Sequence, residues 1–269
     1  MITKADIKKD ISPAKDRGEP IALMEPLLIG ETSRHRGALA DLVRAMNCYY
    51  SNLIEGHDTH PVDIERALKN DYSKDPRKRD LQLEAKAHIT VQKWIDSGGL
   101  KGRTVTSESI REIHHRFGEL LPEDLLWVED TDAKERVRVV PGELRRRDVK
   151  VGAHVAISAG ALPRILNRFE EVYSHLKRTD SILGAATAHH RLLWIDPFLD
   201  GNGRVARLMS HAMLLEALDT GGVWSVARGL ARHVEAYKRH LAGCDGPRRN
   251  DLDGRGNLSE EALAGLLLR

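Results

Sequence analysis

The chain has 269 residues, of which 41% are hydrophobic and 30% are charged, a composition typical of a globular protein with one or two domains. Its 42 Lys and Arg residues nearly balance its 40 Asp and Glu residues, which gives no support to a protein that coats nucleic acid. Two cysteines, Cys48 and Cys244, are too few for a disulfide scaffold or a Cys-rich zinc module. The sequence lacks an apolar run of membrane-spanning length and a signal-peptide pattern, so we expect a cytoplasmic protein with no membrane partner.

Most of the chain is predicted to be helical. Residues 1–35 combine prolines, glycines and charges without an apolar period, and we expect an extended lead-in there. Beyond this segment, apolar residues recur at spacings of three and four, which is typical of helices with one buried face. The helices are predicted over residues 39–55, from 61 onward, and over 78–97, 106–121, 162–176, 181–194, 204–218, 223–241 and 258–268.

One short region has the pattern of β-structure instead. Residues 135–140 and 149–151 alternate and are rich in β-branched side chains, with Pro141 and Gly142 between them. This pattern predicts one small hairpin. The expected fold class is therefore mostly α with a single β-hairpin.

The segment between two of the predicted helices, 181–194 and 204–218, carries the clearest chemistry. Gly201 and Gly203 allow a ligand to approach the backbone closely because they lack a side chain. The following helix presents free N–H groups to this loop, and Arg204 and Arg207 share one face of its first turn. Two guanidinium groups beside such an anion site suit a polyphosphate, and Asp200 could hold Mg²⁺ against it. Because the acid and both arginines are in register, we favour a phosphate site over a tight turn with solvated arginines.

The same loop resembles the signature of the Fic family, H-P-F-x-[D/E]-G-N-G-R-x-x-R. Every signature position matches except the first, where Asp196 replaces the family's histidine. The segment Ser51-Asn-Leu-Ile-Glu-Gly56 resembles the family's inhibitory motif, [S/T]-x-x-x-E-[G/N], and its place before the core resembles the class with an N-terminal inhibitory helix. Residues 141–152 resemble the flap hairpin that positions a target. The matching signature residues are Pro197, Phe198, Asp200, Gly201, Asn202, Gly203, Arg204 and Arg207.

The resemblance implies a Fic-type helical bundle that transfers AMP from ATP to a Ser, Thr or Tyr hydroxyl of a target protein, which can be the chain itself. Asp200 would bind Mg²⁺ between the α- and β-phosphates. Asn202 and the backbone of Gly201 and Gly203 would hold the phosphates. Arg204 would support the leaving pyrophosphate, and Arg207 would grip the γ-phosphate.

The resemblance also implies regulation and target binding. Glu55, in the motif with Ser51 and Gly56, would form a salt bridge with Arg207 and displace the γ-phosphate. The flap would pin the target segment as an added strand. The flap residues expected to do this are Gly142, Glu143, Leu144, Arg145, Val149 and Val151.

The resemblance gives the chain a domain plan. The lead-in 1–35 would precede N-terminal helices at 36–75, which carry the inhibitory motif at 51–56. The core would span 76–245, with the flap at 135–152 and the signature loop at 196–207. Residues 246–269 read as the start of a C-terminal helix that is cut short before a winged-helix segment that many relatives carry, so DNA becomes a partner only if such a segment exists. A homodimer is left open.

Asp196 decides what activity to expect. A carboxyl with an unperturbed pKa of ~3.9 is a weaker base than imidazole at ~6.5, by about 2.6 units, and loss of a general base typically costs ~10²–10⁴-fold. We therefore expect weak or absent AMP transfer. The alternatives are a silent nucleotide-binding regulator, an AMP-removing hydrolase, a raised pKa of Asp196 through burial, and a metal held jointly by Asp196 and Asp200. His189 or His190 as a substitute base is disfavoured, because helical histidines there more often pack in the core.

Overall fold

The computed structural model describes residues 36–130, 135–152, 154–177, 180–218, 222 and 224–244. The predicted lead-in 1–35 and the C-terminal segment 246–269 lie outside the described residues. Within the described ranges the chain is mostly helical, which confirms the expected fold class. A helix long and apolar enough to cross a membrane does not occur among these residues.

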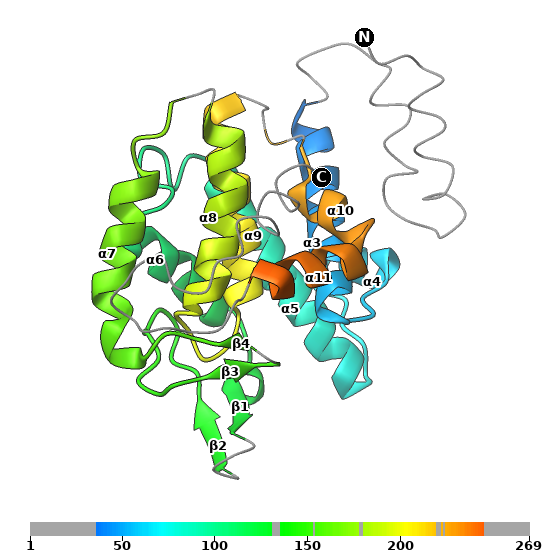
Figure 1. Ribbon diagram of the computed structural model, residues 1–269. Coiled ribbons are helices and arrows are strands. Elements are labelled where there is room, and N and C mark those ends of the chain that lie inside the picture. Colours follow the sequence, from blue (N-terminus) through cyan, green and yellow to red (C-terminus); the bar gives the residue numbers. More distant parts are fainter. Residues whose placement is uncertain are drawn as a thin grey trace.

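The helices surround a central antiparallel pair, α8 and α9, with strands at one end (Figure 1). α6 and α7 cover one side of this pair, and α3, α4, α5, α10 and α11 lie on the other. The loop between α8 and α9 opens at the end that carries the strands, so the signature segment and the flap region share one end of the bundle. The helix bounds are α3 Arg36–Glu55, α4 Pro61–Leu68, α5 Pro76–Asp96, α6 Ser107–Gly118, α7 Leu162–Tyr173, α8 Ser181–Ile195, α9 Asn202–Leu218, α10 Val226–Ala231 and α11 Val234–Cys244, with short 3₁₀ turns η3 Glu123–Leu126 and η4 Ala159–Ala161.

Several helix ends follow from local sequence. Thr106 caps α6 by accepting a hydrogen bond from the Ser109 N–H at 3.1 Å, as its capping pattern predicts. Asp75 caps α5 in the same way. Gly56 ends α3 with a φ of +82°, a conformation that glycine adopts without steric cost.

The described residues form three apolar clusters, and α3 takes part in two of them. The main cluster joins α5 to α9 and buries large side chains such as Ile113, Leu166 and Phe198. A second cluster packs one side of α3, through Val43, Met46, Tyr50 and Ile54, on α10 and α11. A third packs the other side of α3, through Cys48, on α4 and α5. α3 is thus an internal element of the bundle.

The strands differ from the predicted single hairpin. β2 (Glu135–Arg138) pairs with β1 (Trp127–Asp130), and β3 (Lys150–Val151) pairs with β4 (His154–Val155). The predicted pairing of 135–140 with 149–151 is therefore wrong. The partner strands, 127–130 and 154–155, are short and carry no strong alternation that a sequence pattern could have detected.

The predicted helix over 223–241 is also divided. The structure has two shorter helices there, α10 and α11, which meet near His233. Apolar residues of both helices pack against α3. The periodicity of the sequence did not reveal the break between α10 and α11.

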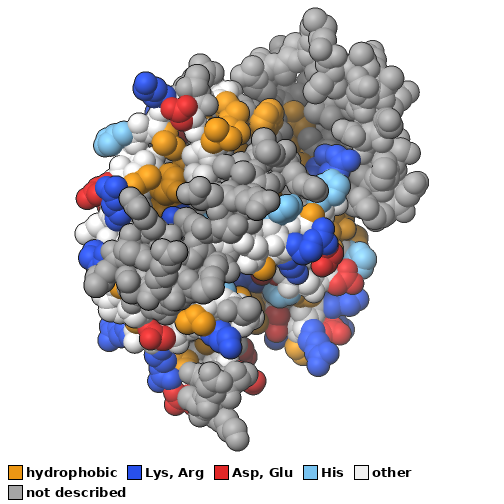
Figure 2. Space-filling view, viewed as in Figure 1, with side chains coloured by type: hydrophobic (Ala, Val, Ile, Leu, Met, Phe, Trp, Pro, Cys, Tyr) orange, Lys and Arg blue, Asp and Glu red, His pale blue; other side chains and the backbone are white. Residues whose placement is uncertain are grey.

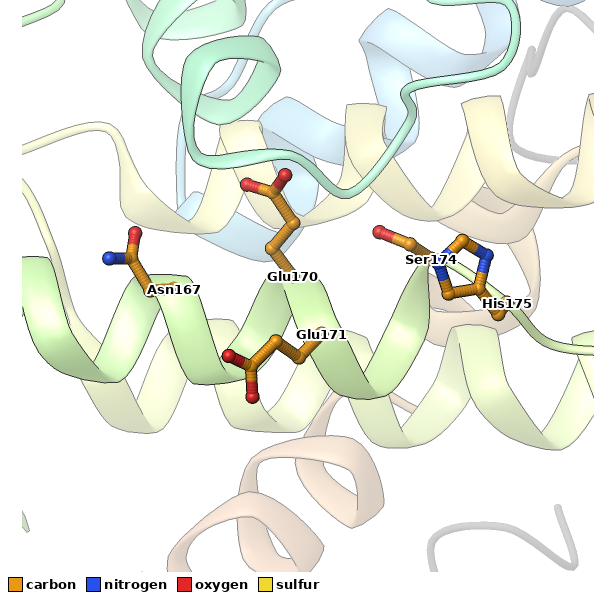
Figure 3. A pocket seen from close by; sticks show the side chains of 5 residues that line it. All are labelled: Asn167, Glu170, Glu171, Ser174 and His175. Atoms are coloured by element: carbon orange, nitrogen blue, oxygen red, sulfur yellow. The ribbon is translucent and has the colours of Figure 1, made fainter.

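Charges are mixed over the face of the molecule shown in Figure 2, where Lys and Arg side chains alternate with Asp and Glu. This agrees with the net charge of +2. Figure 3 shows a surface hollow of about 360 Å³ along α7, lined by Asn167, Glu170, Glu171, Ser174 and His175. Glu170 accepts the backbone N–H of Ser107 at 2.9 Å, so it helps to hold the start of α6, and none of the signature residues lines this hollow.

Candidate functional site

The loop between α8 and α9 is tied into a fixed shape. Asp196 ends α8 in the left-handed region, with φ 51° and ψ 62°. The amide of Asn202 closes the loop with two hydrogen bonds to the backbone of Phe198, accepting its N–H at 3.0 Å and donating to its carbonyl at 2.9 Å. Asn202 was expected to hold phosphates, and its contacts here shape the loop that would hold them.

His114 of α6 braces the loop against the flap region. Its ring stacks on Phe198 with centroids 3.9 Å apart. The Gly142 N–H donates to His114 Nδ1 at 2.8 Å, so the ring proton lies on Nε2, and the ring also hydrogen-bonds to the backbone of Asp200. Burial lowers the pKa of His114 to about 4, so the ring is neutral at physiological pH.

Arg145 joins the flap region to the same loop from the other side. Its guanidinium is buried and donates to the carbonyls of Asp196 at 2.7 Å and Ile157, and its N–H donates to the Pro197 carbonyl at 2.9 Å. Arg145 was expected to help pin a target strand. In the structure its side chain and its N–H instead bind backbone carbonyls inside the protein. The other expected flap residues of this segment, Gly142, Glu143 and Leu144, lie immediately before it in the chain.

Arg207 is buried and fully engaged by the predicted inhibitory motif. Its Nε donates to Ser51 Oγ at 2.8 Å, and its Nη2 forms an ion pair with Glu55. A Cβ added at Gly203 would lie only 2.5 Å from Glu55 Oε1 and 3.1 Å from Arg207 Nη1. The absence of a side chain at Gly203 therefore leaves space for an anion beside Arg207, and the Glu55 carboxylate occupies this space. The inhibitory effect of this contact is a prediction that the geometry alone does not test.

Arg204 has a different acidic partner, which sequence analysis missed. Its Nη2 forms an ion pair with Glu84 of α5, and its guanidinium lies over the Phe117 ring, 5.2 Å from the centroid. Both charged side chains are about nine-tenths buried, with exposed fractions of 10% and 9%. The Nε of Arg204 is buried without a hydrogen-bond partner among the described residues, so its contact with Glu84 is made by the outer end of the guanidinium.

The two acids of the loop have unusual electrostatics. Burial, with a contribution from Asp200, raises the pKa of Asp196 to about 7, against the opposing charge of Arg145. Burial also raises the pKa of Asp200, and the Glu55 carboxylate adds to that shift. Asp196 is therefore a base of nearly the same strength as imidazole, which removes most of the deficit expected from an unperturbed carboxyl.

Asp200 fits a magnesium site shared with phosphates. Among the described residues, no three His, Cys, Asp or Glu side chains are grouped to hold a metal by themselves. The Asp200 side chain reaches the surface from a site that the protein largely encloses, and both this enclosure and the nearby Glu55 carboxylate raise its pKa. A bound cation would relieve this cost of its negative charge. Mg²⁺ is usually held by one or two carboxylates together with phosphate oxygens, so a single carboxylate beside the arginines suits it.

Comparison with known proteins gives this site a family. Residues 104–214, which include α6, the flap region and the signature loop, match the model of the Fic/DOC family. This segment is a Fic/DOC domain. Curated relatives include "Protein adenylyltransferase Fic" of Drosophila erecta, 28% identical over 172 residues, and the protein of the same name in Drosophila virilis, 29% identical. Each match covers 63% of this chain but only 32% of the relative, so this chain spans about a third of those proteins.

Solved structures show the same fold. A Fic-domain-containing signalling protein from Bacteroides thetaiotaomicron aligns with a TM-score of 0.66 and 20% identity, over 90% of this chain and 87% of that one. A Fic family protein from Desulfovibrio desulfuricans aligns with a TM-score of 0.60 and 16% identity, over 99% and 73%. At these identities the likeness concerns the fold of the Fic/DOC domain and its N-terminal helices.

A groove of about 290 Å³ lies beside the signature loop of the Fic/DOC domain. Gly142 and the strand residues Val149 and Val151 do not line it, while Glu143 and Leu144 do. Its remaining lining is Val137, Arg138, Val139, Val140, Arg145, Arg146, Arg147 and Leu199. The groove therefore follows residues 137–147 rather than the whole of the predicted flap.

Three residues around the site were not foreseen as functional: Glu84, His57 and His114. His57 directly follows the inhibitory motif and contacts Glu84 Oε2 from Nδ1 at 2.9 Å. A polar residue within a helical apolar pattern was the available signal for His114. His189, a candidate substitute base, is a core residue. Its two ring nitrogens contact Ser210 and Tyr237, and burial lowers its pKa to about 3.

Proposed function

We propose that this chain transfers AMP from ATP to a hydroxyl of a protein side chain, and that Glu55 restrains this activity. The observation that carries the proposal is the pair of buried arginines beside the glycine loop, Arg204 and Arg207, each with an acid on its guanidinium. The planar guanidinium of arginine matches the geometry of carboxylate and phosphate oxygens, so arginines gathered beside a glycine loop suit a phosphate ligand. The adenylyltransferase name of the curated relatives supports the same reaction.

The proposed reaction is a displacement at phosphorus. The target's hydroxyl oxygen attacks the α-phosphorus of ATP, the bond from that phosphorus to the oxygen bridging the α- and β-phosphates breaks, and pyrophosphate leaves. The carboxylate of Asp196 accepts the hydroxyl proton. Arg204 and Arg207 stabilise the negative charge that develops on the leaving group, with the helix N-terminus at Asn202 contributing its dipole. Mg²⁺ held at Asp200 would supply further charge neutralisation.

The base requires a deprotonated Asp196. Since its pKa is about 7, the base form is a minor species at pH 6 and the major one at pH 8. We therefore expect the transfer rate to rise with pH through about 7. This pKa supports the alternative in which burial strengthens Asp196 as a base, over the expectation of weak or absent transfer from an unperturbed carboxyl.

Restraint by Glu55 follows from competition for one guanidinium. The Glu55 carboxylate already binds Arg207 Nη2. A γ-phosphate would have to displace it to bind the same nitrogen, because the carboxylate and the phosphate are both negatively charged and repel each other. The Glu55 side chain is one-third exposed, which leaves it free to rotate away once a competitor binds.

The test is self-modification with ATP labelled on the α-phosphate. Glu55→Gly is expected to increase incorporation at least tenfold, and Leu53→Gly, an exposed position on the same turn of α3, is the control for a loosened helix end. Within the Glu55→Gly background, Asp196→Asn should lose about 10²–10⁴-fold of the rate while retaining ATP binding by calorimetry, and Asp196→His should retain transfer. Equal incorporation by the Glu55→Gly and Leu53→Gly variants would contradict the restraint.

Two other outcomes identify the alternatives. ATP binding by the Glu55→Gly variant without any transfer would indicate a silent nucleotide-binding regulator. Removal of AMP has one observation in its favour, since Asp196 with a pKa of about 7 can protonate a leaving hydroxyl below neutral pH. Release of AMP from a pre-modified substrate by the unaltered chain, faster at pH 6 than at pH 8, would indicate that reaction. DNA binding, a target other than the chain itself and a homodimer stay predictions for separate measurement.

A further inference from the structure

Arg204 is held in an unusually closed environment for a residue expected to contact substrate. Its side chain is 10% exposed, and burial lowers its pKa to about 10, which still leaves it charged at neutral pH. A buried guanidinium without a counter-ion is costly, so a fixed acid beside it is a condition for its presence. Glu84 is the acid that meets this condition.

Glu84 is itself fixed from two directions. One carboxylate oxygen pairs with Arg204 Nη2, and the other contacts His57 Nδ1 at 2.9 Å. The backbone of Glu84 belongs to the middle of α5, where its neighbours Ala85 and Ala87 are fully buried. A rotation of this carboxylate would abandon both contacts inside the protein.

The two acids therefore differ in their freedom to move. Glu55 lies at the last residue of α3 with a side chain that is one-third exposed. Glu84 lies within a helix with a side chain that is 9% exposed. The mobile side chain of Glu55 suits an acid that phosphate can displace. The fixed side chain of Glu84 suits an acid that holds a guanidinium in one orientation.

The remaining surface of Arg204 points to what Glu84 achieves. Phe117 lies against the guanidinium face, and Glu84 holds one end of its planar fork. These two contacts set the plane of the guanidinium. We propose that Glu84 is a positioning residue for ATP binding: it orients Arg204 so that its remaining N–H groups meet the phosphates. The inference rests on the proposed AMP transfer and adds a residue outside the Fic/DOC match to its machinery.

The test compares three changes at one position in the Glu55→Gly background. Glu84→Gln keeps an oxygen for Arg204 at the same distance, Glu84→Asp withdraws the carboxylate by one methylene, and Glu84→Ala removes it. We expect KM for ATP to rise at least tenfold for Ala and about threefold to tenfold for Asp. For Gln it should stay within about threefold of the parent. Because Arg204 also stabilises the leaving group, kcat should fall in the Ala and Asp variants in which KM rises.

The matched control removes an ion-paired acid outside the nucleotide site. Glu112 of α6 pairs with Arg103 and Arg116, and Glu112→Ala should leave KM for ATP unchanged. A purely structural role for Glu84 would lower the melting temperature and the fraction of active protein, which reduces the apparent kcat but not KM. If Glu84→Ala does not fold, the Asp and Gln pair still separates the two interpretations.

Distinct results overturn the proposal. An unchanged KM in the Ala and Asp variants would show that Glu84 does not position Arg204 for ATP. A KM that falls in both Ala and Gln would show that Glu84 competes with phosphate as Glu55 is proposed to do. If the Glu55→Gly parent neither binds ATP nor transfers AMP, the proposed function fails and the role of Glu84 fails with it. If the parent is active and the Ala variant matches it, the role of Glu84 alone fails.

Discussion

Asp196 occupies a backbone position that tolerates few side chains. Its φ of 51° lies in the left-handed region, where Asn, Asp and His occur several times more often than other non-glycine residues. An aspartate can therefore stand where Fic signatures have histidine without altering the turn that ends α8. What changes is the side chain's length and charge, and burial compensates for part of the difference in base strength.

The raised pKa of Asp196 predicts a pH-dependent cost in stability. The protonated carboxyl is favoured on folding, so its stabilising effect is complete below about pH 4 and is lost as the pH rises through about 7. The difference between about 7 and the unperturbed 3.8 corresponds to roughly 4 kcal/mol at about 1.36 kcal/mol per unit. Asp196→Asn, which mimics the protonated form, should raise the free energy of unfolding by up to this amount at pH 8.5 and by almost nothing at pH 4.

Urea unfolding at the two pH values measures this effect. Asp58→Asn is the matched control, because the Asp58 side chain is 87% exposed. A gain for Asp196→Asn that is equal at both pH values would show that the carboxyl is not the source of the cost.

At the scale of elements, α6 connects the two loops of the site. His114 is one residue of its buried face, yet it binds Gly142 of the flap region and the backbone of Asp200, and stacks on Phe198. Its neighbour His115 is exposed and contacts only the Pro141 carbonyl, at 3.2 Å, and Glu119 among the described residues. One turn of helix thus sets the separation between the flap and the signature loop.

His114→Phe is expected to preserve the stack on Phe198 and lose both hydrogen bonds. We expect faster hydrogen exchange in residues 135–152 and a KM for a target peptide that rises severalfold, because the flap loses its attachment at Gly142. Glu108→Gln, at an exposed position of α6, is the control and should leave exchange in that segment unchanged. Identical exchange in the two variants would mean that His114 is only a packing residue.

The elements also show which features were predictable. Helices could be predicted because their spacing and caps, as at Thr106, are local. The strand pairing could not, since the partners of 135–138 and 150–151 are two- to four-residue segments whose register depends on the surrounding fold. The phosphate loop could be predicted because it is contiguous. Glu84 could not, because α5 is buried on more than one face and its periodicity does not reveal which polar residue points to Arg204.

For the whole molecule, the packing of α3 sets how the proposed restraint can be released. Its apolar residues are buried on one side against α10 and α11, and on the other against α4 and α5. Burying a large apolar side chain contributes about 1.5–3 kcal/mol. Removing α3 from the bundle would therefore cost about as much as the ~5–15 kcal/mol that stabilises a typical domain. We therefore expect the proposed release to occur through rotation of the Glu55 side chain.

Hydrogen exchange tests this conclusion. We expect the amides of residues 43–54 to keep their protection when ATP and Mg²⁺ are added, and equally in the Glu55→Gly variant. Exchange within α7 provides the internal reference, because α7 packs on α6 and α8. A loss of protection along α3 by a hundredfold or more on addition of ATP would show that the helix itself leaves.

The double packing of α3 also bears on how such a protein can change over generations. The segment that carries Ser51 and Glu55 is part of the hydrophobic core, so a deletion that removed the restraint would remove the fold as well. We expect unrestrained descendants to arise instead by substitutions at a few side chains, such as Glu55 or Ser51. A restraint built into a structural helix is in this way protected from loss by truncation.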